Sequence, residues 1–198
     1  MKKHFYLFRH GQSVWNAEGR PHGQHPYPVP LTITGQEQAK ELARLLSDKK
    51  IEIILTSDLL RAEQTANIIG DILKIGVIKD MRFREVDYGL LNGKYTFERE
   101  EIFPSFRKCY ADYALAFPEG ECLNEVAERM NQGMKEYAEN FEYQNIAISS
   151  HRRSIEVLIE KLFDYPCSAL GNCSYAHIVY DTDSHLYEGI ELPKKREY

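Results

Sequence analysis

Short apolar runs alternate with amphipathic stretches along most of the chain. The apolar runs predict buried strands over residues 3–8, 51–55, 76–78 and 145–149, with a hairpin of strands 174–180 and 185–190 near the end. Between them, apolar residues recur at three- and four-residue spacing, which predicts helices over 34–46, 59–73, 123–141 and 154–163. Residues 95–117 also read as helical, with a break at Pro104.

The order of these elements predicts a fold class. Strands that alternate with helices are typical of an α/β domain, in which three layers form around a largely parallel sheet with helices on both faces. A length of 198 residues favours one domain over 1–198, with 95–122 as a helical lid insertion. Ligands bind such sheets beyond the carboxyl ends of the strands, so the residues that follow each strand are the candidates for a site.

Polar residues at the predicted helix starts act as local signals. Thr34 is expected to cap the first long helix, with Glu37 three residues later as its capping-box partner. The run 56–58 (Thr-Ser-Asp) is expected to cap the second. The segment 16–30 contains four prolines and two glycines and reads as a loop.

Charge and composition exclude several classes of protein. The chain has 25 Lys and Arg against 30 Asp and Glu, a formal net charge of −5 that does not fit a general nucleic-acid binder. No apolar run reaches the roughly 18 residues of a membrane-spanning helix. The first apolar stretch is cut by Arg9 and His10 before it is long enough for a signal peptide, so we expect a cytoplasmic protein with reduced cysteines.

Histidine and arginine follow three of the predicted strands. Arg9-His10 ends the first, His151 follows Ser149-Ser150, and Arg61 lies a few residues beyond the strand at 51–55. If these strands are neighbours, the four side chains form a cationic cup in a protein of negative charge. Arginine forks match phosphoryl oxygens, and a neutral imidazole can attack phosphorus. The pattern therefore indicates phosphoryl chemistry.

Six ordered blocks carry a resemblance to a known family. They are R-H-G-Q-S-V-W-N at 9–16, P-L-T at 30–32 with Gly35, S-D-L-L-R-A-E-Q-T-A at 57–66, E-V-D-Y-G-L-L-N-G at 85–93, P-E-G-E at 118–121, and S-H at 150–151. Together they resemble the histidine phosphatase superfamily, whose fold is phosphoglycerate-mutase-like. One R-H-G triplet would be a weak signal, but six blocks in the right order cover nearly the whole chain.

The resemblance implies a role for each matched residue. His10 would accept the phosphoryl group, while Arg9, Arg61 and His151 clamp its oxygens. Ser13 and Asn16 would add hydrogen bonds from the phosphate-binding loop.

Glu85 would protonate the leaving oxygen and then activate water, although Glu98, Glu100, Glu101 and Glu121 are nearby alternatives. No cofactor or metal is implied, because the arginines and histidines supply the electrostatic stabilisation.

The chain departs from the family pattern after the second histidine. The family has small residues there, whereas this chain has Arg152 and Arg153. Arg152 would either narrow the pocket or bind a second anionic group, and Arg153 is expected to face solvent or to pair with an acid. Tyr88, next to the acidic block, is a candidate for the substrate pocket. In the proline-rich loop, His22 and its neighbours are candidate specificity residues.

Two other patterns are set aside. His22 and His25 have the spacing of metal ligands but no third partner, and the glycine-rich run 89–94 lacks the spacing and the hydroxyl of a nucleotide-binding loop. The basic run 194–196 is expected to be a solvated tail.

The expected function is metal-independent hydrolysis of a small phosphorylated metabolite through phosphohistidine at His10. Two alternatives remain open: phosphoryl transfer of the phosphoglycerate-mutase type, and a catalytically silent phosphate-binding or scaffold protein. The short chain favours the phosphatase, because mutases of this family generally carry longer insertions. Expected partners are the metabolite alone, with no nucleic acid and no membrane, and the oligomeric state, a homodimer included, stays open.

Overall fold

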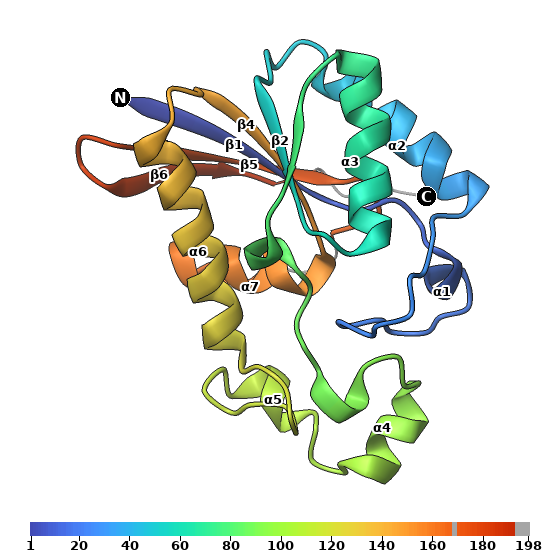
Figure 1. Cartoon of the computed structure of the whole chain (residues 1–198). Coiled ribbons are helices and arrows are strands. Elements are labelled where there is room, and N and C mark those ends of the chain that lie inside the picture. Colours follow the sequence, from blue (N-terminus) through green and yellow to red (C-terminus); the bar gives the residue numbers. More distant parts are fainter. Residues whose placement is uncertain (168–169, 193–198) are drawn as a thin grey trace.

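A mixed sheet forms the centre of the computed structural model, which describes residues 1–167 and 170–192. Within these residues it has six strands in the order β3-β2-β4-β1-β5-β6 (Figure 1). Their bounds are β1 Lys2–Arg9, β2 Ile53–Thr56, β3 Val77–Lys79, β4 Asn145–Ser150, β5 Tyr175–Asp181 and β6 Leu186–Glu191. The pairs β3-β2, β2-β4 and β4-β1 are parallel, whereas β5 pairs antiparallel with β1 and with β6. The sheet is therefore parallel around its centre, with an antiparallel hairpin at one edge.

Helices cover both faces of the sheet, as the sequence predicts. The four long ones are α2 (Ile33–Leu46) and α3 (Leu60–Leu73) on one side, and α6 (Leu123–Asn140) and α7 (Arg152–Phe163) on the other (Figure 1). Three shorter helices are α1 (Val14–Ala17), α4 (Thr96–Ile102) and α5 (Lys108–Ala111), and two 3₁₀ turns are η1 (Met81–Phe83) and η2 (Gly89–Leu91).

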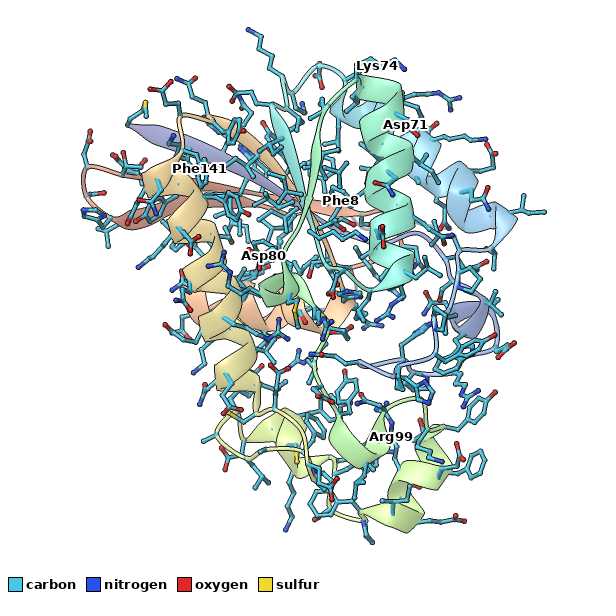
Figure 2. The ribbon with its side chains drawn as sticks, viewed as in Figure 1. Phe8, Asp71, Lys74, Asp80, Arg99 and Phe141 are labelled. Carbon is cyan, nitrogen blue, oxygen red and sulfur yellow. The ribbon has the colours of Figure 1, made fainter. Side chains whose placement is uncertain are left out.

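Alternation along the central strands divides the core in two. On β1, Phe5 and Leu7 pack in the cluster under α6 and α7, while Tyr6 and Phe8 pack against the helices of the opposite face. Figure 2 shows Phe8 between the sheet and α3. Burial of apolar surface stabilises the fold by about 25 cal/mol per Å². The two apolar layers therefore fix the positions of the strand ends.

The segment 95–122 stands apart from the sheet, at the bottom of Figure 1, and contains α4 and α5. It has a third apolar cluster, in which Tyr88, Phe106 and Phe117 are buried together. Arg99 of α4 lies in this lower part of the molecule (Figure 2) and is 3% exposed. The helical break falls before Pro104, because α4 ends at Ile102.

Three helix starts differ from the expectation. The cap of α2 is Thr32, whose Oγ1 accepts from the amide of Gly35, and Thr34 lies inside the helix. Leu59 precedes α3 without a side-chain cap, while Ser57 Oγ accepts from its amide. The helix after β4 begins at Arg152, two residues before the predicted start. Capping residues stood at several adjacent positions, so pattern alone could not choose among them.

Among the described residues, no helix is long and apolar enough to cross a membrane. Cys109, Cys122 and Cys167 are buried free thiols. The basic run 194–196 lies outside the described residues.

Candidate active site

Three parallel strands bring the predicted residues to one edge of the sheet. Arg9 ends β1 and His10 follows it, while His151 follows β4. Ser57 follows β2, and Arg61 lies in the first turn of α3. Because β2, β4 and β1 are adjacent, these residues meet at the carboxyl ends of the strands.

A cavity of about 440 Å³ opens at this edge. Seven of the nine residues proposed from the sequence line it: Arg9, His10, Asn16, Arg61, Glu85, Tyr88 and Arg152. The remaining two, Ser13 and His151, are fully buried beside it. The structure thus brings every sequence-predicted site residue into or against one cavity.

His10 is held in one tautomer. Its Nδ1 lies 2.7 Å from the carbonyl oxygen of Gly11, which can only accept, so Nδ1 carries the proton. Nε2 is then unprotonated, and Nε of Arg61 donates to it at 3.2 Å. Burial and the adjacent charges of Arg61 and Arg9 hold the pKa of His10 well below its usual range. The imidazole is therefore neutral at pH 7, with its lone pair available on Nε2.

A second imidazole lies against the first. The rings of His10 and His151 are 5.2 Å apart between centroids. Nε2 of His151 is 2.9 Å from Oγ of Ser57, and its buried Nδ1 has no hydrogen-bond partner among the described residues. Burial, followed by the charge of Arg61, also holds the pKa of His151 well below its usual range. An unpaired buried nitrogen is costly, and a ligand bound in the cavity could supply the missing partner.

The two arginines of the cup are fixed by backbone oxygens. Nη2 of Arg61 donates to the carbonyl of Gly23 at 3.0 Å, and Nη1 of Arg9 donates to that of Leu170 at 3.0 Å. Burial lowers the pKa of Arg61 to about 10, which still leaves it charged at neutral pH. Nε of Arg9 is buried without a partner among the described residues. Both guanidiniums are therefore held in place by backbone oxygens, and each has further N–H groups that can donate to a ligand.

Glu85 presents one oxygen to the cavity. Its Oε1 accepts from the amide of Val86 at 3.0 Å, and from the amide and hydroxyl of Ser154 at 3.1 and 3.0 Å. These bonds use one carboxylate oxygen and fix the group at the cavity wall. The other oxygen, Oε2, accepts no hydrogen bond from the described residues.

The loop after His10 is organised by Ser13 and His22. Oγ of Ser13 caps α1 by accepting from the amide of Asn16 at 3.2 Å, and it lies 2.9 Å from Nε2 of His22. Oδ1 of Asn16 accepts from the Ser13 amide and from Asn172. Because the Asn16 oxygen is occupied, its amide nitrogen is the group that remains for a ligand in the cavity. Ser13 shapes the loop from behind.

Glycine permits the close approach of this loop to α2. A Cβ on Gly11 would lie 2.4 Å from the carbonyl oxygen of Gly35, and a Cβ on Gly35 would lie 2.0 Å from that of Gln12. Neither contact leaves room for a side chain. The paired glycines therefore set the position of His10 relative to the start of α2.

The two arginines after His151 have different surroundings. Nε of Arg152 donates to Oε1 of Glu156 at 2.9 Å, and the Arg152 side chain is 51% exposed at the cavity. Arg153 pairs with Glu156 and Glu160 and donates to the hydroxyl of Tyr113 in the segment 95–122. The expected acid partner of Arg153 is present. Arg153 also lines the cavity, which the sequence analysis did not predict.

Aromatic residues form the cavity wall that faces the segment 95–122. Tyr88 and Tyr110 both line the cavity, and burial, with Tyr110 beside it, raises the pKa of Tyr88 well above its usual range. The guanidinium of Arg99 lies 4.5 Å from the Tyr88 ring centroid, and its Nη1 donates to the Tyr110 hydroxyl. This wall is neutral and partly apolar.

Sequence reasoning missed some residues of the cavity wall: Arg20, Tyr110, Arg153 and Glu156. His22, named only as a specificity candidate, is 7% exposed, and burial followed by the charge of Arg61 lowers its pKa to about 2. A signal existed for Glu156, because it lies four residues after Arg152 and three after Arg153 on one helix. Nothing in the sequence marked Tyr110.

The chain belongs to the histidine phosphatase superfamily. The family model for branch 1 of that superfamily matches residues 5–191. This membership defines a phosphatase or a mutase, and the resemblance predicted from the six blocks is confirmed.

Several curated relatives of the chain are named as phosphoglycerate mutases. The chain is 31% identical over 191 residues to a protein of Erwinia tasmaniensis named "Probable phosphoglycerate mutase GpmB", covering 93% of this chain and 88% of the relative. An Escherichia coli protein of the same name is 30% identical with the same coverage. Since the chain spans most of these relatives, its length does not separate a phosphatase from a mutase.

Solved structures share the fold. YhfR of Bacillus stearothermophilus is 26% identical with a TM-score of 0.84, covering 94% of both chains. A mycobacterial glucosyl-3-phosphoglycerate phosphatase is 24% identical with a TM-score of 0.85, covering 97% of this chain and 98% of that one. The phosphoglycerate-mutase-like α/β fold predicted from the sequence is confirmed.

Proposed function

We propose that the protein is a metal-independent phosphomonoesterase that hydrolyses a small phosphorylated metabolite through a phosphohistidine intermediate on His10. The observation that carries the proposal is the state of His10, whose Nδ1 proton is donated to Gly11 while Nε2 faces Arg61. A neutral imidazole with an unprotonated Nε2, surrounded by guanidiniums that can move onto phosphoryl oxygens, is the arrangement needed to attack a phosphoryl group.

In the first step, the lone pair on Nε2 of His10 forms a bond to phosphorus. The bond from phosphorus to the leaving oxygen breaks, and that oxygen takes a proton from Glu85. Arg9, Arg61 and His151 stabilise the negative charge on the three remaining phosphoryl oxygens. The alcohol leaves, and phosphohistidine remains with Glu85 ionised.

In the second step, the oxygen of a water molecule attacks phosphorus while Glu85 takes a proton from that water. The phosphorus–nitrogen bond breaks, its electron pair returns to Nε2, and inorganic phosphate leaves. Two displacements through one histidine divide a difficult hydrolysis into two easier reactions. No step calls for a metal, because the arginines supply the charge.

Access to water favours hydrolysis over transfer. The cavity is lined by the exposed Gly19 and by Arg152, which is half exposed, so its mouth is open to solvent above the buried His10. A mutase must keep its phosphoenzyme away from water until the second acceptor oxygen binds. An open cavity gives water the advantage of concentration.

Mutase activity is the second candidate, favoured by the names of the curated relatives at 30–31% identity. A silent phosphate-binding protein is disfavoured by Glu85, because a binding site for an anion gains nothing from a carboxylate in its wall. The cytoplasmic location and the absence of nucleic-acid and membrane partners stay predictions.

Phosphate release separates these candidates. Wild type and His10→Ala are supplied with p-nitrophenyl phosphate and with a panel of phosphorylated metabolites, in the presence of a chelator and without a bisphosphorylated primer. We expect wild type to release phosphate and His10→Ala to be inactive. Isomerisation of phosphoglycerate that requires the primer would identify a mutase, and two equally inert proteins that bind phosphate would identify a binding module.

A further inference from the structure

We propose that Arg152 forms a second anion subsite, so that the preferred substrates are phosphomonoesters that carry an additional, singly charged anionic group such as a carboxylate. This inference rests on the proposed function and names the substrate class of the same cavity. It concerns the recognition of the leaving group, which the phosphoryl cup does not perform.

The position of Arg152 is the first support. It directly follows His151, which lies against His10, and its side chain lines the same cavity as Arg9 and Arg61. The side chain is 51% exposed, whereas Arg61 is 4% exposed. The guanidinium therefore stands at the mouth of the cavity, outside the buried phosphoryl cup, where the rest of a substrate would extend.

The guanidinium is oriented, and among the described residues only one of its N–H groups is hydrogen-bonded. Its Nε donates to Glu156, a glutamate that is 4% exposed and fixed in α7. A guanidinium has five N–H donors, and this bond uses one. Arg153 pairs with the same carboxylate, so the charge of Glu156 is shared between two cations. A preorganised arginine fork binds a carboxylate with little loss of side-chain entropy.

The placement of this arginine is unfavourable for a helix. Arg152 and Arg153 occupy the first two positions of α7, at the positive end of the helix dipole, where acidic residues stabilise and basic residues destabilise. A purely structural ion pair would place the cations near the other end. An anion bound by Arg152 at this position would offset the unfavourable interaction between the arginine and the helix dipole.

Charge in the cavity favours an anionic substrate. Five arginines line the cavity, and Glu156 and Glu160 pair with two of them at α7. Arg9, Arg20 and Arg61 form no ion pair with a carboxylate of the described residues. The cavity therefore attracts negatively charged ligands to its mouth, where Arg152 stands.

Matched substrates test the subsite. Two pairs differ only in a carboxylate replaced by a hydroxymethyl group: 3-phosphoglycerate with glycerol 3-phosphate, and 4-carboxyphenyl with 4-(hydroxymethyl)phenyl phosphate. We expect kcat/KM of wild type to favour the anionic member of at least one pair by about tenfold or more at low salt. Arg152→Gln should reduce that preference to near one, because it weakens the reaction of the anionic member far more than that of the neutral member.

Control variants separate the subsite from general effects. Arg44→Gln removes an equal charge from an exposed position on α2 and should leave the preference unchanged. Arg152→Lys keeps the charge without the fork and should retain part of it. The melting temperature of Arg152→Gln should not fall, because the lost ion pair is offset by removal of a cation from the helix start.

The result does not depend on turnover. Calorimetric binding of the same pairs to His10→Ala, alone and combined with Arg152→Gln, reads the subsite even if every compound resists hydrolysis. Equal affinity of His10→Ala for both members of each pair, or a preference that survives Arg152→Gln, would overturn the subsite. Hydrolysis of the neutral esters by wild type would in that event leave the phosphatase proposal standing.

Discussion

Nε of Arg61 donates to Nε2 of His10 at 3.2 Å, so the lone pair that would attack phosphorus is covered by a guanidinium in the free protein. Nη2 of Arg61 also donates to the carbonyl of Gly23, in the loop between α1 and α2. A phosphoryl group must take the place of this contact, and its oxygens offer Arg61 stronger, charge-assisted hydrogen bonds. The exchange couples ligand binding to release of the nucleophile.

Replacement of Arg61 should change how His10 titrates. The charge of Arg61 is a major cause, after burial, of the lowered pKa of His10. Arg61→Gln removes that charge, so we expect the pKa of His10 to rise towards its usual range. As the pH is lowered, His10 should then become protonated, and activity should be lost, at a higher pH than in wild type. The loss of a transition-state donor should also reduce kcat by about 10²–10³-fold. NMR titration of the His10 ring and pH–rate profiles measure both effects. An unchanged His10 titration would contradict the assignment, and Arg44→Gln serves as the control.

Glu85→Gln tests the proton donor. The amide keeps the shape of the carboxyl group but cannot give a proton to the leaving oxygen. We expect kcat for an alkyl phosphate to fall about 10²–10⁴-fold, with a much smaller loss of phosphate affinity. The defect should be smaller in phosphorylation by p-nitrophenyl phosphate, whose leaving group needs no proton. A burst of p-nitrophenol followed by slow turnover would fit loss of the second step alone. Equal losses for both esters in the first step would move the acid role to another residue.

Ser154 is expected to act as a positioning residue for Glu85. Its amide and hydroxyl both contact Oε1, and the hydroxyl also lies 2.9 Å from the carbonyl of Arg84. Ser154→Ala leaves the hydrogen bond from the backbone amide but removes the one from the hydroxyl, so the Glu85 carboxyl group can rotate more freely. We therefore expect kcat for alkyl phosphates to fall about tenfold with little change in KM.

The matched control is Ser149→Ala, which removes a buried hydroxyl of β4 that donates to the carbonyl of Ala62 in α3. If Ser154→Ala slowed p-nitrophenyl and alkyl phosphates by the same factor, with the same loss of melting temperature as the control, its role would be structural only.

Three neutral histidines should make stability depend on pH. The pKa values of His10 and His151 lie well below their usual range, and that of His22 is lowered to about 2. The unfolded chain binds these protons near pH 6.5, but the folded protein does not. Their contribution is therefore present above pH 6.5 and is lost as the pH falls below it, by up to about 1.4 kcal/mol per pH unit for each histidine.

Urea unfolding between pH 7 and pH 5 measures this slope. His22→Asn removes one of the three groups and should make the decline shallower, whatever its effect at pH 7. A slope in the variant equal to that of wild type would show that His22 is protonated in the folded state.

The fold and the buried part of the site could be predicted from the sequence because both depend on local pattern. Each central strand is a short apolar run, and the residues after it lie at the same edge once the strands are parallel neighbours. Ordered motifs then located Arg9, His10, Arg61 and His151. Helix starts were less predictable, since Thr32 and Thr34 are both able to cap and only the tertiary contact with the loop after His10 selects Thr32.

The outer wall of the cavity could not be predicted in the same way. Tyr110 reaches it from the segment 95–122, whose path depends on packing with aromatic side chains distant in sequence, such as Tyr88. Arg153 reaches it while bonded to Tyr113 of the same segment. These contacts join segments separated by tens of residues, and no periodic pattern encodes them. Substrate choice depends on this wall.

The central claim is that His10 carries the phosphoryl group, and rapid quenching tests it most directly. Wild-type protein is mixed with p-nitrophenyl phosphate, quenched in alkali within the first turnover, and mapped by mass spectrometry. The account predicts an alkali-stable, acid-labile phosphohistidine on the peptide that contains His10, absent from His10→Ala. An adduct on another residue, or undiminished hydrolysis by His10→Ala, would contradict it.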